Sequence, residues 1–335
     1  MADILFNLDS GLADPMFGKW QHPIKKVIED RAKIWEKKSL IPVLFDVQTS
    51  DKYGETIMDQ TGMESWDPVA EGGEVPMTGM QIGDKKFIEH VTFMKGFALT
   101  RKAVDDAQYA NLRKQPIAFT NGYYKGREEL AGAMFRAALQ QQGQCKYKQW
   151  IFDATAGDGL PLFHSAHKSA LKNKGAQCNA FTDEFSVEAL DAVETEMQNF
   201  TDHNGDLLSI QPTHIVIPNE ATLKRKVFAA IGADQDPDGA TNGFNYQYGR
   251  WTVVIDPWLN PLVKLGLKPW FLMDESYNHD NSGAVWFDRV RMEITSHIEK
   301  NRVNEWTGYA RYSPGFFDWR AFGAGGLNSG TKLVG

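Results

Sequence analysis

The chain has 335 residues, 42% of them hydrophobic and 12% aromatic, which is enough to bury a core in one large domain or two. Its net charge of −7 argues against a general polyanion-binding surface, because neutralising phosphates requires clustered Lys and Arg. No run of about 18 apolar residues predicts a membrane-spanning helix, and the N-terminus, with Asp3, lacks the basic start of a signal peptide.

The N-terminal region predicts an amphipathic helix that starts after Pro23. This helix either covers its own chain or packs on a neighbouring molecule. Membrane binding is disfavoured, since the apolar face is short and acidic residues dilute the charge. Residues 39–49 then read as a strand. The apolar residues are Ile24, Val27, Ile28, Ile34 and Trp35, and the basic residues are Lys19, Lys25, Lys26, Arg31, Lys33, Lys37 and Lys38.

Residues 60–99 predict a long two-stranded hairpin with a loose tip around residues 71–84, because turn formers are dense in the middle and β-formers follow. Arms of roughly 12 residues would reach about 40 Å, whereas a compact chain of this length has a radius of gyration of about 20 Å. A ribbon of this kind is marginal alone in water, so another subunit should stabilise it. The alternative is that both strands join a central sheet.

A helical region is predicted from Thr100, which can serve as an N-cap, with a second start at Pro116. Beyond Pro116, apolar residues recur at steps of three, four and seven up to Gln142 and Gly143. This pattern predicts the longest helix of the chain. The apolar residues are Tyr123, Leu130, Ala131, Met134, Phe135, Ala138 and Leu139.

Residues 181–274 alternate helix and strand, which predicts a second, α/β unit. The acidic, glycine-rich segment 232–245 predicts a mobile loop within it. The other elements are a helix over 185–200 with Ser186 as N-cap, a buried strand over 214–217, a helix capped by Pro218-Asn219 that carries Leu223, Val227, Phe228 and Ile231, and strands over 251–256 and 270–273.

In residues 284–298, apolar side chains alternate with polar ones, which predicts a long half-buried strand. This strand returns the chain to the first unit, so the second unit is an insertion. Residues 306–322 should complete the sheet beside the long helix. Their aromatic side chains indicate core and interface packing rather than a ligand cluster, and they are Trp306, Tyr309, Phe316, Phe317 and Trp319.

Few residues could carry chemistry. His164 and His167 could share a metal with Asp153 or Asp158, as in a metal-dependent hydrolase, but the Glu of a His-Glu-x-x-His motif is missing. No nucleophile elbow, P-loop or dinucleotide fingerprint occurs. The two cysteines, Cys145 and Cys178, are too few for a disulfide framework and read as passive thiols in a reducing cytoplasm. We therefore expect no enzyme activity, no catalytic residue, no metal site and no cofactor.

Four segments, in this order, resemble the major capsid proteins of tailed bacteriophages with the HK97-like fold. The resemblance is strongest over residues 153–322, weaker over 60–142, and poor over the first fifty residues. The segments are Leu162-Phe163-His164 followed by His167, the strand-to-helix step at Pro218, Trp270-Phe271-Leu272, and Phe317-Asp318-Trp319-Arg320.

The resemblance implies an α+β fold in which an axial domain is inserted into a peripheral domain that contains a long spine helix and long strands. The implied divisions are an N-terminal arm (1–50), an extended hairpin loop (51–99), the peripheral domain (100–180), the axial domain (181–274), and a return to the peripheral domain (275–335).

The resemblance also implies that copies of the chain assemble into pentamers and hexamers of an icosahedral head around double-stranded DNA, without sequence specificity. The protein would be a virion component assembled in the bacterial cytoplasm, with scaffold, portal and decoration proteins as further partners and no membrane contact. An encapsulin-like compartment, which shares the fold and encloses cargo enzymes, is the alternative, and DNA content separates the two.

Some HK97-like shells join a hairpin Lys to an Asn of a neighbouring subunit, assisted by a carboxylate. Lys and Asn are common surface residues and most relatives lack the bond, so we expect none here. The candidates are Lys85 and Lys86 on the hairpin, and Asn301, Asn304, Glu299 and Glu305 near the C-terminus.

Overall fold

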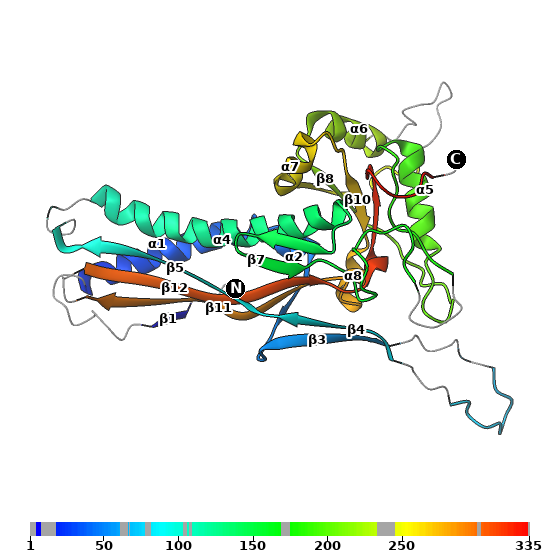
Figure 1. Cartoon of the computed structure of the whole chain (residues 1–335), viewed down its shortest axis with the longest axis horizontal. Coiled ribbons are helices and arrows are strands. Elements are labelled where there is room, and N and C mark those ends of the chain that lie inside the picture. The colour runs from blue at the N-terminus through cyan, green and yellow to red at the C-terminus, as the bar shows by residue number, and fades with distance from the viewer. Residues whose placement is uncertain are drawn as a thin grey trace.

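The protein has an α+β fold, as predicted, with a long unit, a smaller unit at one end and a projecting hairpin (Figure 1). The long unit combines extended strands with a long helix, and the smaller one carries shorter helices and strands (Figure 1). The computed structural model describes residues 5–7, 18–60, 66, 68–77, 82–102, 106, 109–168, 175–232, 245–299 and 303–333.

The long unit is built on a sheet of five of the described strands, in which β11, β12 and β5 are antiparallel neighbours. Both β1 and β2 run parallel to β11. The strand predicted over 284–298 is confirmed with the same bounds. The strands are β1 (Leu5–Asn7), β2 (Asp46–Thr49), β5 (Val91–Thr100), β11 (Ala284–Ile298) and β12 (Val303–Phe316).

Two helices pack against each other along this sheet, α1 (Gly18–Glu36) and α4 (Tyr109–Leu139). With 31 residues, α4 is the longest described helix, as predicted. Each helix contains a proline at which the sequence predicted the helix to begin, Pro23 in α1 and Pro116 in α4. Both predicted starts are wrong, because each proline lies inside its helix. A proline removes one backbone hydrogen bond, and packing of an apolar face over the whole helix outweighs that loss. The helical start expected at Thr100 runs into residues outside the described ones.

The α1 helix covers its own chain, as the first of its two alternatives had it. Ile24 and Ile28 are buried in a small cluster with Met292 and Ile294 of β11 and Trp306 of β12. Around this apolar stripe, Lys26, Asp30 and Lys33 are exposed.

The strand predicted over residues 39–49 is wrong in its first half, where α2 (Ile41–Leu44) forms instead. Pro42 lies in the first turn of this helix, where its missing N–H costs nothing. The buried Glu128 of α4 fixes the start of α2, because its carboxylate accepts hydrogen bonds from Ser39 Oγ and from the Leu40 backbone N–H.

The smaller unit contains a four-stranded sheet in the order β13-β10-β8-β9, and its predicted strands and longer helices are confirmed. Ser186 caps its first helix as predicted, whereas the second is capped by Glu220 rather than Asn219. The elements are α5 (Val187–Gln198), β8 (His214–Pro218), α6 (Ala221–Ile231), β9 (Thr252–Asp256), η1 (Pro257–Leu259), α7 (Asn260–Lys264), β10 (Trp270–Met273), α8 (Glu275–Asp280), η2 (Trp319–Ala321) and β13 (Phe322–Gly325). Residues 233–244 of the predicted mobile loop lie outside the described residues.

The C-terminal segment crosses between the units, which corrects the expectation that residues 306–322 all complete the first sheet. The first sheet keeps β12 up to Phe316. After the η2 turn, β13 pairs with β10 in the second sheet instead. The chain beyond it stays there, since Phe181 bridges to Thr331.

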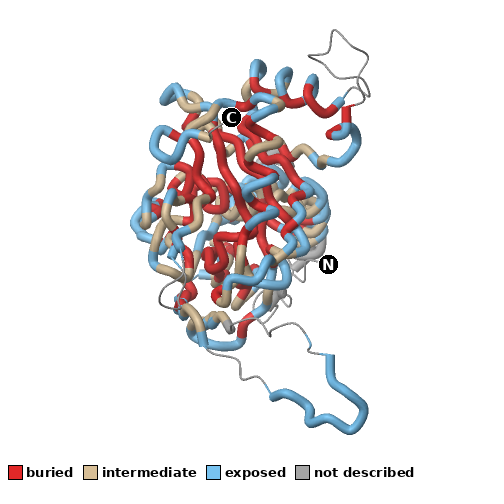
Figure 2. Tube along the Cα trace, turned by 90° about the vertical axis from the view of Figure 1, so that its right-hand side faces the viewer, coloured by how far each residue is buried: buried red, intermediate tan, exposed pale blue. Residues whose placement is uncertain are grey.

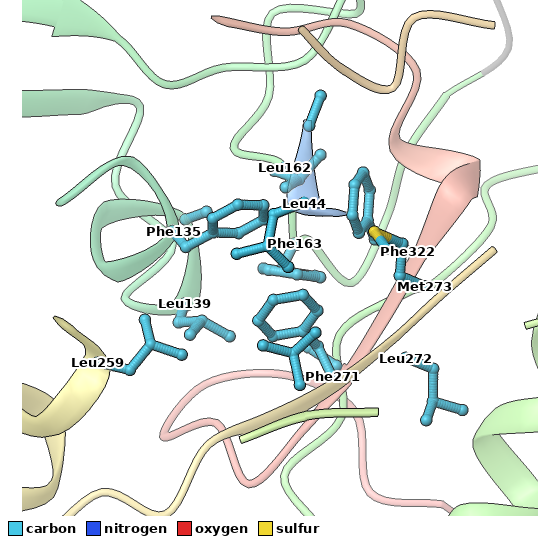
Figure 3. Packing of buried hydrophobic residues seen from close by; sticks show 14 of the residues in the cluster. Leu44, Phe135, Leu139, Leu162, Phe163, Leu259, Phe271, Leu272, Met273 and Phe322 are labelled. Carbon is cyan, nitrogen blue, oxygen red and sulfur yellow. The ribbon is translucent and has the colours of Figure 1, made fainter. Parts of the chain in front are cut away.

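One apolar core runs through both units. Figure 3 shows Phe135 of α4 facing Phe271 of β10, and their ring centroids are 5.1 Å apart. Phe163, from the loop with the two histidines, and Phe322 of β13 pack on the same Phe271 ring. The α4 helix therefore anchors the smaller unit through its C-terminal half.

A short hairpin after α4 was not predicted. Its strands, β6 (Gln144–Tyr147) and β7 (Trp150–Asp153), pair antiparallel across a turn in which Lys148 has a φ of 54°. The available sequence signal was the alternation of polar and apolar residues over Gln144–Tyr147, and in β6 the apolar Cys145 and Tyr147 are the buried ones.

Candidate assembly surfaces

The hairpin is shorter than predicted. Its two paired strands, which we call its root, pack against the rest of the chain. Its strands are β3 (Gly54–Gln60) and β4 (Ile82–Glu89), which pair antiparallel over roughly 25 Å. The expected second arm up to residue 99 is wrong, because β5 joins the main sheet. The alternative that both strands join a central sheet holds for β5 alone, since β3 and β4 form a separate two-stranded sheet. The break falls at His90, whose buried ring is hydrogen-bonded to Ser50 and Ser313 at 2.9 and 2.8 Å.

Apolar packing fixes the root of the hairpin on the outer face of β11. Ile88 of β4 is buried with Val285 and Phe287, and Ile57 of β3 packs against them. This cover explains why the first five residues of β11 are all buried, where the alternation of the sequence predicted a half-buried strand.

Polar contacts hold the same root to two other segments. Lys86 is buried, lies 3.3 Å from Asp153 Oδ2 and donates a hydrogen bond to the Thr155 carbonyl. Burial lowers the pKa of Lys86, and the nearby Asp153 carboxylate partly offsets that effect. On β3, Asp59 Oδ2 lies 2.6 Å from Nε2 of the buried His203, in the smaller unit.

The far end of the hairpin is exposed. Every described residue from 68 to 77 is exposed, and Figure 2 shows this segment projecting away from the body. Apolar side chains lie among them, with Val75 76% and Met77 94% exposed. Two carboxylates, Glu71 and Glu74, flank the Gly72-Gly73 turn, where Gly72 has a φ of 79° that favours glycine. We call residues 68–77 the hairpin tip.

A groove of about 510 Å³ lies between α4, the sheet strands β5 and β12, and the β6–β7 turn. We call it the spine groove. Its walls include the stacked Phe93 and Tyr312, whose ring centroids are 4.2 Å apart. Met94, 73% exposed, and Trp150, 49% exposed, stand at its rim. The exposed Lys95 and Lys148 complete the rim, and the remaining lining residues are Thr92, Ala118, Phe119, Gly122, Tyr123, Gly126, Tyr147, Gln149, Met292, Gly308, Tyr309 and Ala310.

The histidines considered for a metal-dependent hydrolase lie in one turn with partners from the protein itself. His167 is buried, with Nδ1 2.7 Å from Asp158 Oδ2 and Nε2 3.2 Å from Asn179 Oδ1. Its ring stacks on Trp319 at 4.2 Å between centroids. His164 Nδ1 accepts a hydrogen bond from the Ala166 backbone N–H. These contacts use both ring nitrogens of His167 to fix the loop, and among the described residues no group of three His, Cys, Asp or Glu could hold a metal.

The structure does not bring the candidate cross-linking groups together within one chain. Lys86 points into its own subunit, while Lys85 is exposed on β4. Asn304 is buried on β12, and Asn301 lies outside the described residues. Glu299 is exposed and Glu305 is half-buried.

Both cysteines are free. Cys145 is buried, and burial raises the pKa of its thiol to about 11. Cys178 is half-buried and donates to the Ala180 carbonyl. None of the described helices combines the length and apolar character needed to cross a membrane.

Comparison with known proteins assigns the chain to a family. The family model described as phage capsid protein matches residues 84–324, over two thirds of the chain. Among solved structures, a chain from Mycobacterium phage Patience is 10% identical, with 100% of this chain and 95% of that chain covered and a TM-score of 0.49. The capsid of Myoviridae phage XM1 is 10% identical, with 85% of this chain and 91% of that chain covered and a TM-score of 0.47. A virus-like particle from Pyrococcus furiosus is 8% identical, with 92% of this chain and 97% of that chain covered and a TM-score of 0.44. No curated protein sequence matches. The chain belongs to the phage capsid protein family.

Proposed function

We propose that this protein is the shell-forming subunit of a tailed-phage head with the HK97-like architecture, and that its rings are pentamers and hexamers that close into an icosahedron. The observation that carries the proposal is the hairpin, which is fixed at its root and exposed at its tip. In this arrangement the hairpin has a set direction and presents apolar side chains to a neighbour.

Association through such a hairpin is heterologous, because the tip of one subunit meets a different surface on the next. A heterologous contact generates a ring when the rotation between subunits closes. Burial of apolar surface stabilises each contact by about 25 cal/mol per Å², less the cost of ordering the segments that meet. Repetition around a ring makes individually modest contacts sufficient.

The proposed divisions are an arm over residues 1–50, a hairpin loop over 51–99, a peripheral domain over 100–180 with a return over 275–335, and an axial domain over 181–274. The crossing of β13 into the second sheet means that the return segment serves both domains. The shared core around Phe135 and Phe271 supports a subunit that moves as one body during assembly.

In this proposal the protein acts without catalysis and encloses double-stranded DNA without reading its sequence. The net charge of −7 suits a container that does not hold DNA tightly. Scaffold, portal and decoration proteins are its further partners, and assembly takes place in the host bacterial cytoplasm.

Negative-stain electron microscopy of the purified full chain tests the proposal. We expect uniform closed shells or rings, and in phage-infected cells shells that protect DNA from nuclease. A chain that stays monomeric at every concentration would contradict the proposal. Shells filled with protein cargo and free of DNA would instead support an encapsulin-like compartment.

A further inference from the structure

Two arginines lie side by side on the face of the main sheet that is opposite to α4. Arg311 of β12 is the register partner of Val290 of β11, and Arg289 lies just before Val290 at a β-bulge. Successive residues of a strand point to opposite faces, and Tyr312, next to Arg311, contacts Arg127 of α4. Arg311 therefore points to the outer face of the sheet, on which the hairpin root is also fixed.

Both guanidinium groups act on one imidazole, that of His90, at the point where β4 ends and β5 begins. Burial lowers the pKa of His90, and the charges of Arg311 and Arg289 lower it further. The Glu55 carboxylate acts in the opposite direction. Because both ring nitrogens of His90 already have serine partners, the two guanidinium groups converge beside a neutral ring.

The protein supplies little negative charge to this arginine pair. Nε of Arg311 is buried without a hydrogen-bond partner, and Arg311 forms no ion pair with any described residue. Nε of Arg289 is also buried without a partner. The one ion pair that either arginine forms within the described part of the chain joins Arg289 Nη1 to Asp51 Oδ1 at 3.8 Å, and the Asp51 side chain is fully exposed.

Two further carboxylates of this region have other partners. Glu55 accepts hydrogen bonds from Ser50 Oγ at 2.7 Å and from Lys52 Nζ at 3.0 Å. Glu89 accepts one from the Tyr53 hydroxyl. The arginine pair therefore consists of two half-buried cations with one exposed anion beside them. Buried charge without a counter-ion is costly, so the arrangement is incomplete without an anion.

The hydrogen-bond donors of the pair suit a phosphate group. Each guanidinium can direct two parallel N–H groups at an oxyanion. Thr92 of β5 is the register partner of Arg311, so its side chain lies on the same face and adds a hydroxyl. A carboxylate offers two oxygens and one charge, whereas a phosphate group offers at least three strong acceptor oxygens and about −1.5 to −2 charges.

We propose that Arg289 and Arg311 bind a phosphate group on the outer face of the main sheet, beside the hairpin root, with Thr92 as a further donor. The group comes from free inorganic phosphate or from the phosphodiester backbone of a nucleic acid, which present the same oxyanion. The inference goes beyond the proposed function and does not depend on it, since one subunit carries the whole site.

Isothermal titration calorimetry with inorganic phosphate tests the site. The full chain is titrated at low ionic strength in a buffer without other oxyanions, because salt screens charges that are partly exposed. We expect one saturable site per chain. Arg289→Gln and Arg311→Gln should each weaken binding about tenfold or more, since each removes charge-assisted hydrogen bonds. Arg311→Lys keeps the charge but loses the planar fork, so its affinity should lie between those of the unmodified protein and Arg311→Gln.

A matched control and a second measurement accompany the titration. Arg225→Gln removes the same charge from an exposed position of α6 and should leave the affinity unchanged. Phosphate should raise the melting temperature of the unmodified protein but not of the two Gln variants, because a ligand stabilises only the state that binds it. Without phosphate, the Gln variants should melt no lower than the unmodified protein, since each removes a charge that lacks a counter-ion.

A short DNA duplex distinguishes the two sources of the phosphate group. If the duplex displaces inorganic phosphate, and if each Gln variant lowers the salt dependence of duplex binding by about one ion, the site takes a nucleic-acid backbone. If the duplex does not compete while phosphate binds, the site takes the free ion. Either result supports the phosphate site.

Three results would overturn the inference. Phosphate binding may not saturate, or it is the same in the Gln variants as in the unmodified protein. Acetate competes as strongly as phosphate, which makes the pair a carboxylate site. The Gln variants lose closed particles although phosphate does not bind, which assigns the pair to a carboxylate of a second copy. None of these results removes the shell function, which particle formation by the unmodified protein tests separately.

Discussion

Asp59 on the hairpin and His203 in the smaller unit lie 2.6 Å apart, and this contact links two segments 144 residues apart in the sequence. His203 is buried, and Gly83 of β4 lies against its ring, where a Cβ would come 3.2 Å from Nε2. Both strands of the hairpin therefore meet one imidazole. The direction of the hairpin is set by the smaller unit as well as by the main sheet.

Replacing His203 should loosen the hairpin without unfolding the subunit. His203→Ala removes a hydrogen bond to a carboxylate, worth about 1.5–3 kcal/mol. Amide hydrogen exchange should accelerate in β3 and β4, while the core strands of both sheets keep their protection. His297→Ala, at an exposed histidine of β11, is the matched control. Equal exchange in β3 and β4 of both variants would show that the contact does not orient the hairpin.

The ion pair between Arg127 of α4 and Asp288 of β11 should be the most sensitive polar contact of the long unit. Asp288 is buried and Arg127 is half-buried, their side chains lie 3.0 Å apart, and the guanidinium lies over the rings of Trp286 and Tyr312 at 5.0 and 5.2 Å. Arg127→Ala leaves the Asp288 carboxylate buried without its main partner, so we expect a loss of about 3–5 kcal/mol in the free energy of unfolding. Urea denaturation measures it.

Two further variants serve as controls for Arg127→Ala. Arg225→Ala, at an exposed position of α6, should change the free energy of unfolding by less than about 0.5 kcal/mol. A double variant, Arg127→Met with Asp288→Leu, should recover much of the loss, because it removes both charges of the pair. A double variant as unstable as Arg127→Ala would mean that lost packing, not an unpaired charge, causes the effect.

Asp256, at the end of β9, should make stability depend on pH between about 4 and 6. Burial raises the pKa of its carboxyl from 3.8 to about 6, although it accepts a hydrogen bond from the Trp258 backbone N–H. In this window the folded state keeps a proton that the unfolded state releases, so stability falls as pH rises and stays lower above pH 6. A shift of about two units corresponds to about 3 kcal/mol.

The Asp256→Asn variant isolates this effect. Asparagine can accept the same hydrogen bond without a charge, so the variant should gain up to about 3 kcal/mol relative to the unmodified protein between pH 4 and pH 7. Urea denaturation at several pH values measures the difference. A difference that stays constant with pH would place the carboxyl at its ordinary pKa.

Much of the fold could be predicted because local pattern and tertiary environment agree. The strand at 284–298 and the Ser186 cap are confirmed, since alternation and capping chemistry act within a few residues. The errors fall where distant contacts decide. Pro116 did not start a helix, because packing along α4 outweighs one missing hydrogen bond. The helix over residues 41–44 begins where the Leu40 backbone N–H meets Glu128, 88 residues away from Leu40 in the sequence.

For the candidate assembly surfaces too, local sequence predicts only what does not depend on distant contacts. Glycine and proline density marked the hairpin, but its length depended on His90, whose partners Ser50 and Ser313 are distant in sequence. The spine groove could not be predicted at all, since it forms only where α4, β5, β12 and the missed β6–β7 turn meet.

Assembled particles boiled in SDS should give a single band at the mass of one chain, 37.7 kDa. A Lys–Asn bond between subunits needs a hairpin amine that reaches its neighbour, and Lys86 instead is held at Asp153 and Thr155 of its own subunit. Asn304, on β12, is also buried. A ladder of bands that persists under reducing conditions would contradict this, and Lys85→Arg would then identify whether the exposed amine forms the bond.

Replacing the hairpin tip should separate folding from assembly. In the variant, residues 68–77 become a Gly-Ser loop of equal length, while β3, β4 and the contacts of Ile88 and Lys86 stay intact. All ten replaced residues are exposed, so the melting temperature should change by no more than a few degrees.

Closed particles should be lost, because the apolar and acidic groups that meet the neighbour are gone. Light scattering and electron microscopy measure particle yield, and a variant with Lys125→Glu and Lys146→Glu, at exposed positions of α4 and β6, serves as control. Normal particles from the Gly-Ser variant would show that shell formation depends on surfaces other than the tip.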